Sequence, residues 1–205
     1  MTNLLIMLCS LFIALPLYAN PCMQMLMGGT TTAAEPPAAC TTQASPTDME
    51  TYAGYYSEIH TTSAVKYVSS MFVAGGNDAI CKICLSLYSS TGTSPTYSQT
   101  LYIYGDDEGK PNGADVKDTF ETRDMTGVLT GSYAWVCWTS ASPFTMTKGT
   151  TYHVVTMSSG YDATNVQKWG RDATCASEAQ ARSADGSSWT SIETARCGMM
   201  QLYKE

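Results

Sequence analysis

The sequence predicts an all-β protein, an antiparallel β-sandwich of the jelly-roll-like kind with about nine or ten strands. Short runs rich in β-branched and aromatic residues recur along the chain, and turn-forming Gly, Pro, Ser, Asn and Asp separate them. Some of these runs also alternate, as a strand with two different faces does. In residues 80–88, one face carries Cys81, Ile83, Leu85 and Leu87, and the other carries Lys82, Cys84, Ser86 and Tyr88.

The clearest pair of strands lies between residues 133 and 157. In its first run, every second residue belongs to the set Ala134, Val136 and Trp138, which alternates with Trp135, Cys137 and Thr139. A turn at Lys148-Gly149 leads to a second run over 152–157. We expect this pair to form a hairpin beside which the other strands lie. Those strands are expected at 55–60, 65–73, 80–88, 99–104, 116–122, 127–130, 166–170, 178–183, 188–192 and 199–203.

The N-terminus has the layout of a secretory signal peptide. An apolar run covers residues 4–15, and Leu17-Tyr18-Ala19 ends on a small residue, so we expect cleavage after Ala19. The alternative is an uncleaved membrane anchor, because no Lys or Arg precedes the run. However, the run is shorter than the roughly 20 residues of a spanning helix, and no basic cluster follows it. We therefore expect a secreted, extracellular protein without a membrane span after cleavage.

The composition divides the chain into three segments. Residues 1–19 are the signal peptide, 20–50 form a Thr/Pro-rich tail or linker, and 51–205 form the β-sandwich domain. The tail shows no sustained apolar period, which is typical of an extended stalk. Only 14% of residues are charged and the net charge is −7. Nucleic-acid binding is disfavoured, because it needs clustered Lys and Arg.

Eight cysteines are present, and seven remain after the signal peptide removes Cys9. In an oxidising compartment we expect disulfides, with one cysteine left over. The residues Cys81 and Cys84 should not bond each other, because three residues of a strand span about 10 Å. We expect the pairs Cys175–Cys197 and Cys22–Cys40. The set Cys81, Cys84 and Cys137 would then hold one bond and one spare thiol.

No catalytic residues, metal site or cofactor are expected. The chain has no Gly-X-Ser-X-Gly motif, and no pair of acidic residues stands out as a glycosidase pair. The acidic run Asp106-Asp107-Glu108 fits a calcium site or a solvated turn, and we expect the turn. Residues 183–189 resemble an Asp-box, but the motif is one residue short and occurs once, so we expect a folded turn there.

Aromatic residues give the best indication of a binding site. Tyr102, Tyr104, Tyr133, Trp135, Trp138, Trp169 and Trp189 exceed what one core face can absorb. Exposed Trp and Tyr rings stack on sugars, while nearby polar side chains bond the hydroxyl groups. The alternative is that Trp135 or Trp138 faces the core and that Tyr merely suits a strand. Because loops carry binding, the residues expected to bind ligand are Trp169, Arg171, Asp172 and Trp189.

Several motifs together resemble a known family of secreted modules. They are Gly-Asp-Asp-Glu-Gly-Lys-Pro-Asn-Gly at 105–113, Tyr-Ala-Trp-Val at 133–136, Met-Thr-Lys-Gly-Thr-Thr-Tyr at 146–152, Trp-Gly at 169–170 and Asp-Gly-Ser-Ser-Trp at 185–189. In this order they resemble the jelly-roll-like sandwich modules of bacterial, archaeal and phage surface proteins called choice-of-anchor R domains. The resemblance covers roughly residues 51–205. It implies an accessory, non-catalytic module and supplies no catalytic residues.

Two functions of different classes follow. The first is a non-catalytic module that binds glycan or another surface ligand by aromatic stacking and hydrogen bonds. The second is a structural subunit of a surface layer or fibre, which would self-associate through its N-terminal tail, as an added strand, or through an intermolecular disulfide.

Overall fold

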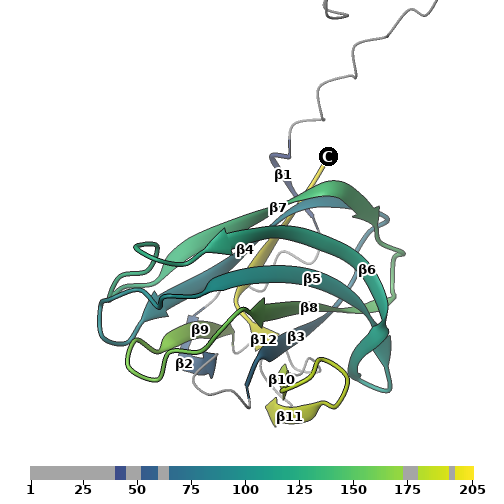
Figure 1. Ribbon diagram of the computed structural model, residues 1–205. Coiled ribbons are helices and arrows are strands. Elements are labelled where there is room, and N and C mark those ends of the chain that lie inside the picture. Colours follow the sequence, from purple (N-terminus) through teal and green to yellow (C-terminus); the bar gives the residue numbers. More distant parts are fainter. Residues whose placement is uncertain (1–39, 45–51, 60–64, 173–179, 194–196) are drawn as a thin grey trace, which may run out of the picture. The chain divides into compact units, whose positions relative to one another are not determined.

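The computed structural model describes residues 40–44, 52–59, 65–172, 180–193 and 197–205, and these residues form strands and their connections (Figure 1). The predicted all-β antiparallel class is confirmed. Within the ranges described, no helix is long and apolar enough to cross a membrane. The predicted signal peptide, residues 1–19, lies outside them, as does most of the predicted tail.

The described residues contain thirteen strands, where nine or ten were expected. Two of the additional strands, β1 and β12, have only two residues each. The strands are β1 (Thr42–Gln43), β2 (Tyr52–Ile59), β3 (Tyr67–Val73), β4 (Ala79–Ser89), β5 (Ser98–Asp107), β6 (Lys110–Asp124), β7 (Ala134–Thr145), β8 (Thr151–Ser158), β9 (Gln167–Asp172), β10 (Gln180–Ser183), β11 (Thr190–Glu193), β12 (Cys197–Gly198) and β13 (Met200–Lys204).

The strands follow one hydrogen-bonded path, β1-β13-β4-β7-β6-β5-β8-β3-β10-β11, with β9 joined to β4, β2 and β12. A single residue pair, Phe120 with Ser140, joins β6 to β7 and divides the path into two halves. The first half is built around β4 and β7, and the second around β5, β8 and β3 (Figure 1). The two halves meet at the core, where the Trp138 indole N–H of β7 donates to the Gln99 carbonyl of β5.

The predicted hairpin over residues 133–157 is wrong, although both of its strands exist. The strand β7 pairs with β4 and β6, whereas β8 pairs with β5 and β3. The connection between them bonds to the β3–β4 connection instead: the Met146 N–H donates to the Asp78 carbonyl, and the Gly149 N–H donates to the Ala74 carbonyl. Met146 is also buried in the core. The chain therefore passes from the first half to the second between β7 and β8. The β3–β4 connection passes between the same two halves, and the hydrogen bonds join the two connections.

The predicted strand at 127–130 is also wrong, because these residues form turns after β6. The turn expected within residues 105–113 is confirmed. It joins β5 to β6 through Glu108 and Gly109, whose φ values are 52° and 79°. Two central residues with positive φ define the type I′ hairpin turn, which suits the twist of the strands it connects.

The core is formed by the alternating residues of the central strands. In β4 it takes Ile83, Leu85 and Leu87, as the alternation predicts, together with Ile80 beyond an irregularity in the β4–β7 register. Trp138 and Trp169 are the largest fully buried side chains. The Trp169 ring lies across Gly198 of β12, where an added Cβ would overlap the indole. The strands β9 and β12 can therefore pack this closely only because residue 198 has no side chain.

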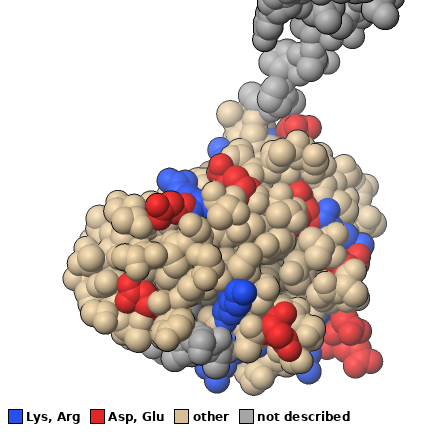
Figure 2. All heavy atoms as spheres, in the orientation of Figure 1, with Lys and Arg blue, Asp and Glu red and all other residues tan. Residues whose placement is uncertain are grey.

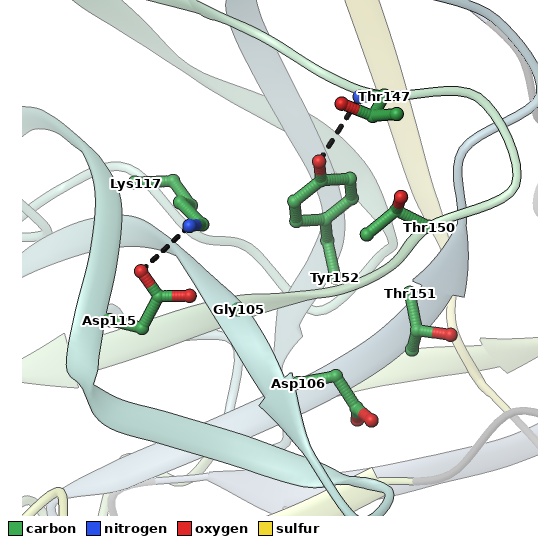
Figure 3. A pocket seen from close by; sticks show the side chains of 8 residues that line it. All are labelled: Gly105, Asp106, Asp115, Lys117, Thr147, Thr150, Thr151 and Tyr152. Atoms are coloured by element: carbon green, nitrogen blue, oxygen red, sulfur yellow. Dashed lines mark hydrogen bonds and ion pairs between the residues drawn. The ribbon is translucent and has the colours of Figure 1, made fainter.

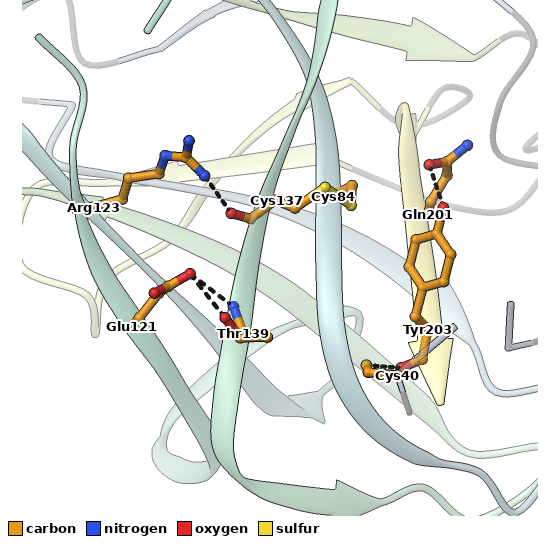
Figure 4. Close-up of a disulfide and its surroundings, with 8 residues drawn as sticks. All are labelled: Cys40, Cys84, Glu121, Arg123, Cys137, Thr139, Gln201 and Tyr203. Carbon is orange, nitrogen blue, oxygen red and sulfur yellow. Dashed lines mark hydrogen bonds between the residues drawn. A yellow bond between two sulfur atoms is a disulfide. The ribbon is translucent and has the colours of Figure 1, made fainter. Parts of the chain in front are cut away.

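Two disulfides attach other segments to β4. Cys40 bonds Cys81, and Cys84 bonds Cys137, as Figure 4 shows. The predicted pair Cys22–Cys40 is thus wrong. Residues 42–43 already add a strand to β13, and this pairing brings Cys40 next to Cys81, whose Cα lies 5.9 Å away. The β-domain predicted to begin at residue 51 consequently leaves out one strand, β1.

As expected, Cys81 and Cys84 do not bond each other. Cys197 is also disulfide-bonded. Its predicted partner, Cys175, lies outside the described residues, and so does Cys22. All five cysteines in the described ranges are bonded, so the predicted spare thiol is not Cys81, Cys84 or Cys137.

Gly198→Ala should destabilise the fold, because its Cβ needs space that the buried Trp169 ring occupies. Overpacking of this kind costs roughly 3 kcal/mol of unfolding free energy. Chemical denaturation should show this loss, with Gly131→Ala as the control: it is exposed, and the nearest atom to its added Cβ is 3.7 Å away. Equal stability of the two variants would contradict the packing described.

Removing either described disulfide as a double alanine variant should lower the unfolding free energy by about 4 kcal/mol, the chain-entropy value for closed loops of 41 and 53 residues. Denaturant titration measures the loss. Non-reducing peptide mapping should confirm the connectivity, since cleavage after Lys82 separates Cys81 from Cys84. A peptide linking Cys22 to Cys40 would be the contrary result.

Candidate functional site

The structure does not support the predicted binding role of Trp169. This side chain is 0% exposed, and its indole N–H donates to the Met199 carbonyl over 2.8 Å. It lies in β9, between β2 and β4, and points into the core. A buried ring has no free face on which a sugar could stack, so the prediction is wrong for this residue.

The other three predicted residues do not form one surface with it. Arg171 is half-buried and donates from Nε to the Gln180 side chain, and Asp172 is fully buried in β9. Trp189 is half-buried and packs edge-on against Tyr67, with ring centroids 6.4 Å apart. Trp189 is therefore the predicted residue that keeps a partly accessible ring.

The segment before Trp189 is the folded turn that the sequence predicts. One carboxylate oxygen of Asp185 accepts the backbone N–H groups of Ser187 and Ser188, each over 2.8 Å. These hydrogen bonds hold the pKa of Asp185 well below its usual range. Its carboxylate thus has a structural role within the turn.

The first half of the sheet carries aromatic side chains on the face turned away from the core. The residues that alternate with the core positions of β4, β7 and β13 lie on this side, which we call the outer face: Lys82, Cys84, Ser86, Tyr88, Tyr133, Trp135, Cys137, Thr139, Gln201 and Tyr203. Two of them, Cys84 and Ser86, are themselves buried. Trp138 belongs to the core and Trp135 to the outer face, where it is 39% exposed. Tyr88 and Tyr133 pack together beside it, with ring centroids 4.3 Å apart.

The Cys84–Cys137 disulfide lies in the middle of the outer face (Figure 4). Trp135 lies two residues before Cys137 in β7 and is paired with Ser86. Polar groups surround the disulfide. The Arg123 guanidinium donates to the Cys137 carbonyl over 2.8 Å, and the Glu121 carboxylate accepts both N–H and O–H of Thr139. On the other side, the Tyr203 hydroxyl donates to Gln201, and the Lys82 ammonium lies 4.1 Å from the Tyr203 ring centroid. The outer face thus combines exposed aromatic area with fixed donors and acceptors.

A polar pocket of about 360 Å³ lies elsewhere, between the β5–β6 hairpin and the β7–β8 connection (Figure 3). Its lining includes Asp106, Asp115 and Lys117, with Thr147, Thr150 and Thr151 on another side. The pocket was not predicted from the sequence, because three segments that are separated along the chain form it. Figure 2 shows charged side chains scattered in small groups over a largely uncharged surface.

Asp106 is held by a buried histidine. His153 Nε2 lies 2.8 Å from Asp106 Oδ1, and the second carboxylate oxygen accepts the Gly109 N–H. His153 is 1% exposed, and burial lowers its pKa despite the opposing effect of Asp106. The neutral ring therefore donates Nε2–H to the carboxylate. No group of three or more metal-ligating His, Cys, Asp or Glu side chains occurs in the described ranges. The hydrogen bond from Gly109 ties Asp106 to the β5–β6 turn.

Comparisons with known proteins give no assignment. No protein-family model matches the chain, and neither a curated protein nor a solved structure matches it. The likeness to choice-of-anchor R modules rests on the sequence motifs alone.

His153 should make stability depend on pH. Its pKa is depressed in the folded state, so below the unfolded value of about 6.5 the unfolded chain binds a proton that the folded chain refuses. The unfolding free energy should fall as pH drops from 7.5 to 5.5, and His153→Phe should remove this part of the fall. Denaturant titrations of both proteins at both pH values test this; parallel pH profiles would exclude it.

Proposed function

We propose that the chain is a secreted, non-catalytic β-module that binds a glycan on its outer face, with Trp135 as the stacking platform. The exposed Trp135 ring is the observation that carries this proposal. An indole offers a large, rigid apolar surface at low cost in side-chain entropy, which suits the apolar face of a pyranose ring.

The groups around Trp135 supply the hydrogen bonds that a sugar needs. Arg123 uses one N–H on Cys137 and has four more, and Gln201 uses only its carbonyl oxygen on Tyr203. The disulfide beneath them covalently joins β4 to β7. Preorganised strands reduce the ordering cost of binding, which would otherwise weaken a shallow site.

The absence of catalysis is part of the proposal. Glycoside hydrolysis generally uses two facing carboxyl groups. Beside the outer face, the Glu121 carboxylate is engaged by the N–H and O–H groups of Thr139. The disulfides are compatible with an extracellular protein. The motifs shared with accessory surface modules support the same role.

Self-association through the tail is less well supported. Residues 42–43 occupy the edge of β13 in their own sheet, so this part of the tail is not available to a neighbouring subunit. An intermolecular disulfide would need a cysteine outside the five that the structure describes.

Trp135→Ala should weaken glycan binding at least tenfold. The full-length chain, secreted through an oxidising route, would be screened on a glycan array, and the best glycan would then be titrated by calorimetry. Tyr161→Ala is the matched control, because Tyr161 is a 58% exposed aromatic residue in the β8–β9 connection, away from β7. Its affinity should equal that of the parent protein, and glycan recovered from the complex should be intact.

Two results would reject this function: no binding across the array by a folded protein, or equal affinity of Trp135→Ala and the parent. Hydrolysis of the bound glycan would reject the non-catalytic role.

A further inference from the structure

We propose that the pocket between the β5–β6 hairpin and the β7–β8 connection is a second, independent site, which binds a small uncharged polyol such as a single pyranose ring. The outer face binds by stacking on an open surface, whereas the pocket binds by hydrogen bonds in a concavity. Its volume of about 360 Å³ is near the lower end of the range for small-molecule sites, roughly 300–1,000 Å³.

One wall of the pocket is built by irregularities in β6. The register runs from Tyr104–Val116 directly to Gly105–Asn112, so residues 113–115 have no partners in β5. This bulge places the Asp115 carboxylate against Gly105, where an added Cβ would collide with it. Bulges often aim a side chain at a site, and the glycine here makes room for the carboxylate.

The charged groups of this wall form an ion pair. Asp115 Oδ1 lies 2.7 Å from the Lys117 ammonium, and Figure 3 shows this pair across the pocket from the threonines. An acceptor beside a donor is suited to two neighbouring sugar hydroxyls, because each hydroxyl can both donate and accept.

Asp106 forms the third charged group and is also held in place. Its carboxylate takes the Nε2–H of buried His153 and the Gly109 N–H, so it cannot rotate freely. The other ring nitrogen of His153, Nδ1, is buried and has no partner among the described residues. His153 does not line the pocket itself, and it contributes by holding the Asp106 carboxylate.

The opposite wall offers hydroxyl groups. Thr147, Thr150 and Thr151 line the pocket, and within the described chain their side-chain oxygens form no hydrogen bond. Tyr152 closes the back, where its hydroxyl oxygen accepts the Thr147 N–H. The threonine hydroxyls are therefore available to a ligand.

The net charge of the pocket lining indicates which class of ligand it suits. Two carboxylates and one ammonium leave the lining negative, which disfavours phosphates, uronates and sialic acids. A divalent cation is disfavoured by the ammonium on Asp115, and calcium needs six to eight oxygen ligands. An uncharged polyhydroxylated molecule satisfies donors and acceptors on both walls.

The test uses the full-length secreted protein, labelled with ¹⁵N, and methyl glycosides of glucose, galactose, mannose, xylose and N-acetylglucosamine as probes. We expect at least one to bind with Kd of the order of 1 mM, with amide shifts concentrated at Gly105, Asp106, Asp115, Thr150 and Thr151. Asp115→Asn and Thr150→Val should each weaken binding at least fivefold. Thr145→Val, an exposed threonine outside the lining, should leave it unchanged.

The Trp135→Ala variant separates this site from the outer face. If the proposal is right, Trp135→Ala binds the methyl glycoside as the parent does. Shifts that vanish in Trp135→Ala would assign the sugar to the outer face and overturn the pocket site. The absence of amide shifts with every methyl glycoside, at concentrations up to 20 times the expected Kd, would also overturn the proposal. Amide shifts at Asp106 and Asp115 that only calcium produces would overturn it as well.

Discussion

The pairing of β4 with its neighbours is the constraint on which the rest of the structure depends. This strand bonds to β7 on one side and to β13 and β9 on the other. It also carries two cysteines three residues apart, of which Cys81 holds the segment before β1 and Cys84 holds β7. One face of β4 contributes Ile83, Leu85 and Leu87 to the core, so backbone hydrogen bonds, apolar burial and covalent bonds coincide in one strand.

The alternation in the sequence predicted the long central strands, because a side-chain period of two is a local property. It missed the two-residue strands β1 and β12 and wrongly placed a strand at 127–130. It placed β4, β5 and β8 to within a few residues, and it showed that Trp135 and Trp138 face opposite sides. It could not show that β7 and β8 lie in different halves of the sheet. That outcome depends on Met146 and Gly149 bonding to the β3–β4 connection, which is a contact between distant segments. The pairing of Cys40 with Cys81 was missed for the same reason, since it follows from the position of β1.

For the candidate sites too, the sequence indicated local properties but not the contacts between distant segments. Composition indicated an excess of aromatic residues, but burial decides which of them meets solvent. Trp169 was expected to bind ligand and is instead buried against Gly198, whereas Trp135 has the exposed ring. The pocket joins residues 105–106, 115–117 and 147–152, and no local pattern in any one of these segments indicates a site. Its walls depend on a bulge in β6, which only the register of the folded sheet reveals.

The Cys40–Cys81 bond has a mechanical consequence. Only two residue pairs join β1 to β13, so tension on the chain N-terminal to Cys40 would peel that strand away readily if hydrogen bonds alone held it. The disulfide instead transmits the load directly into β4, which is paired with β7, β13 and β9. It also removes the 41-residue segment between the two cysteines from the extensible length, which amounts to about 140 Å of chain at full extension. Force applied from the N-terminal side is therefore resisted by the pairing of β4 with its neighbours, and not by the two residue pairs that join β1 to β13.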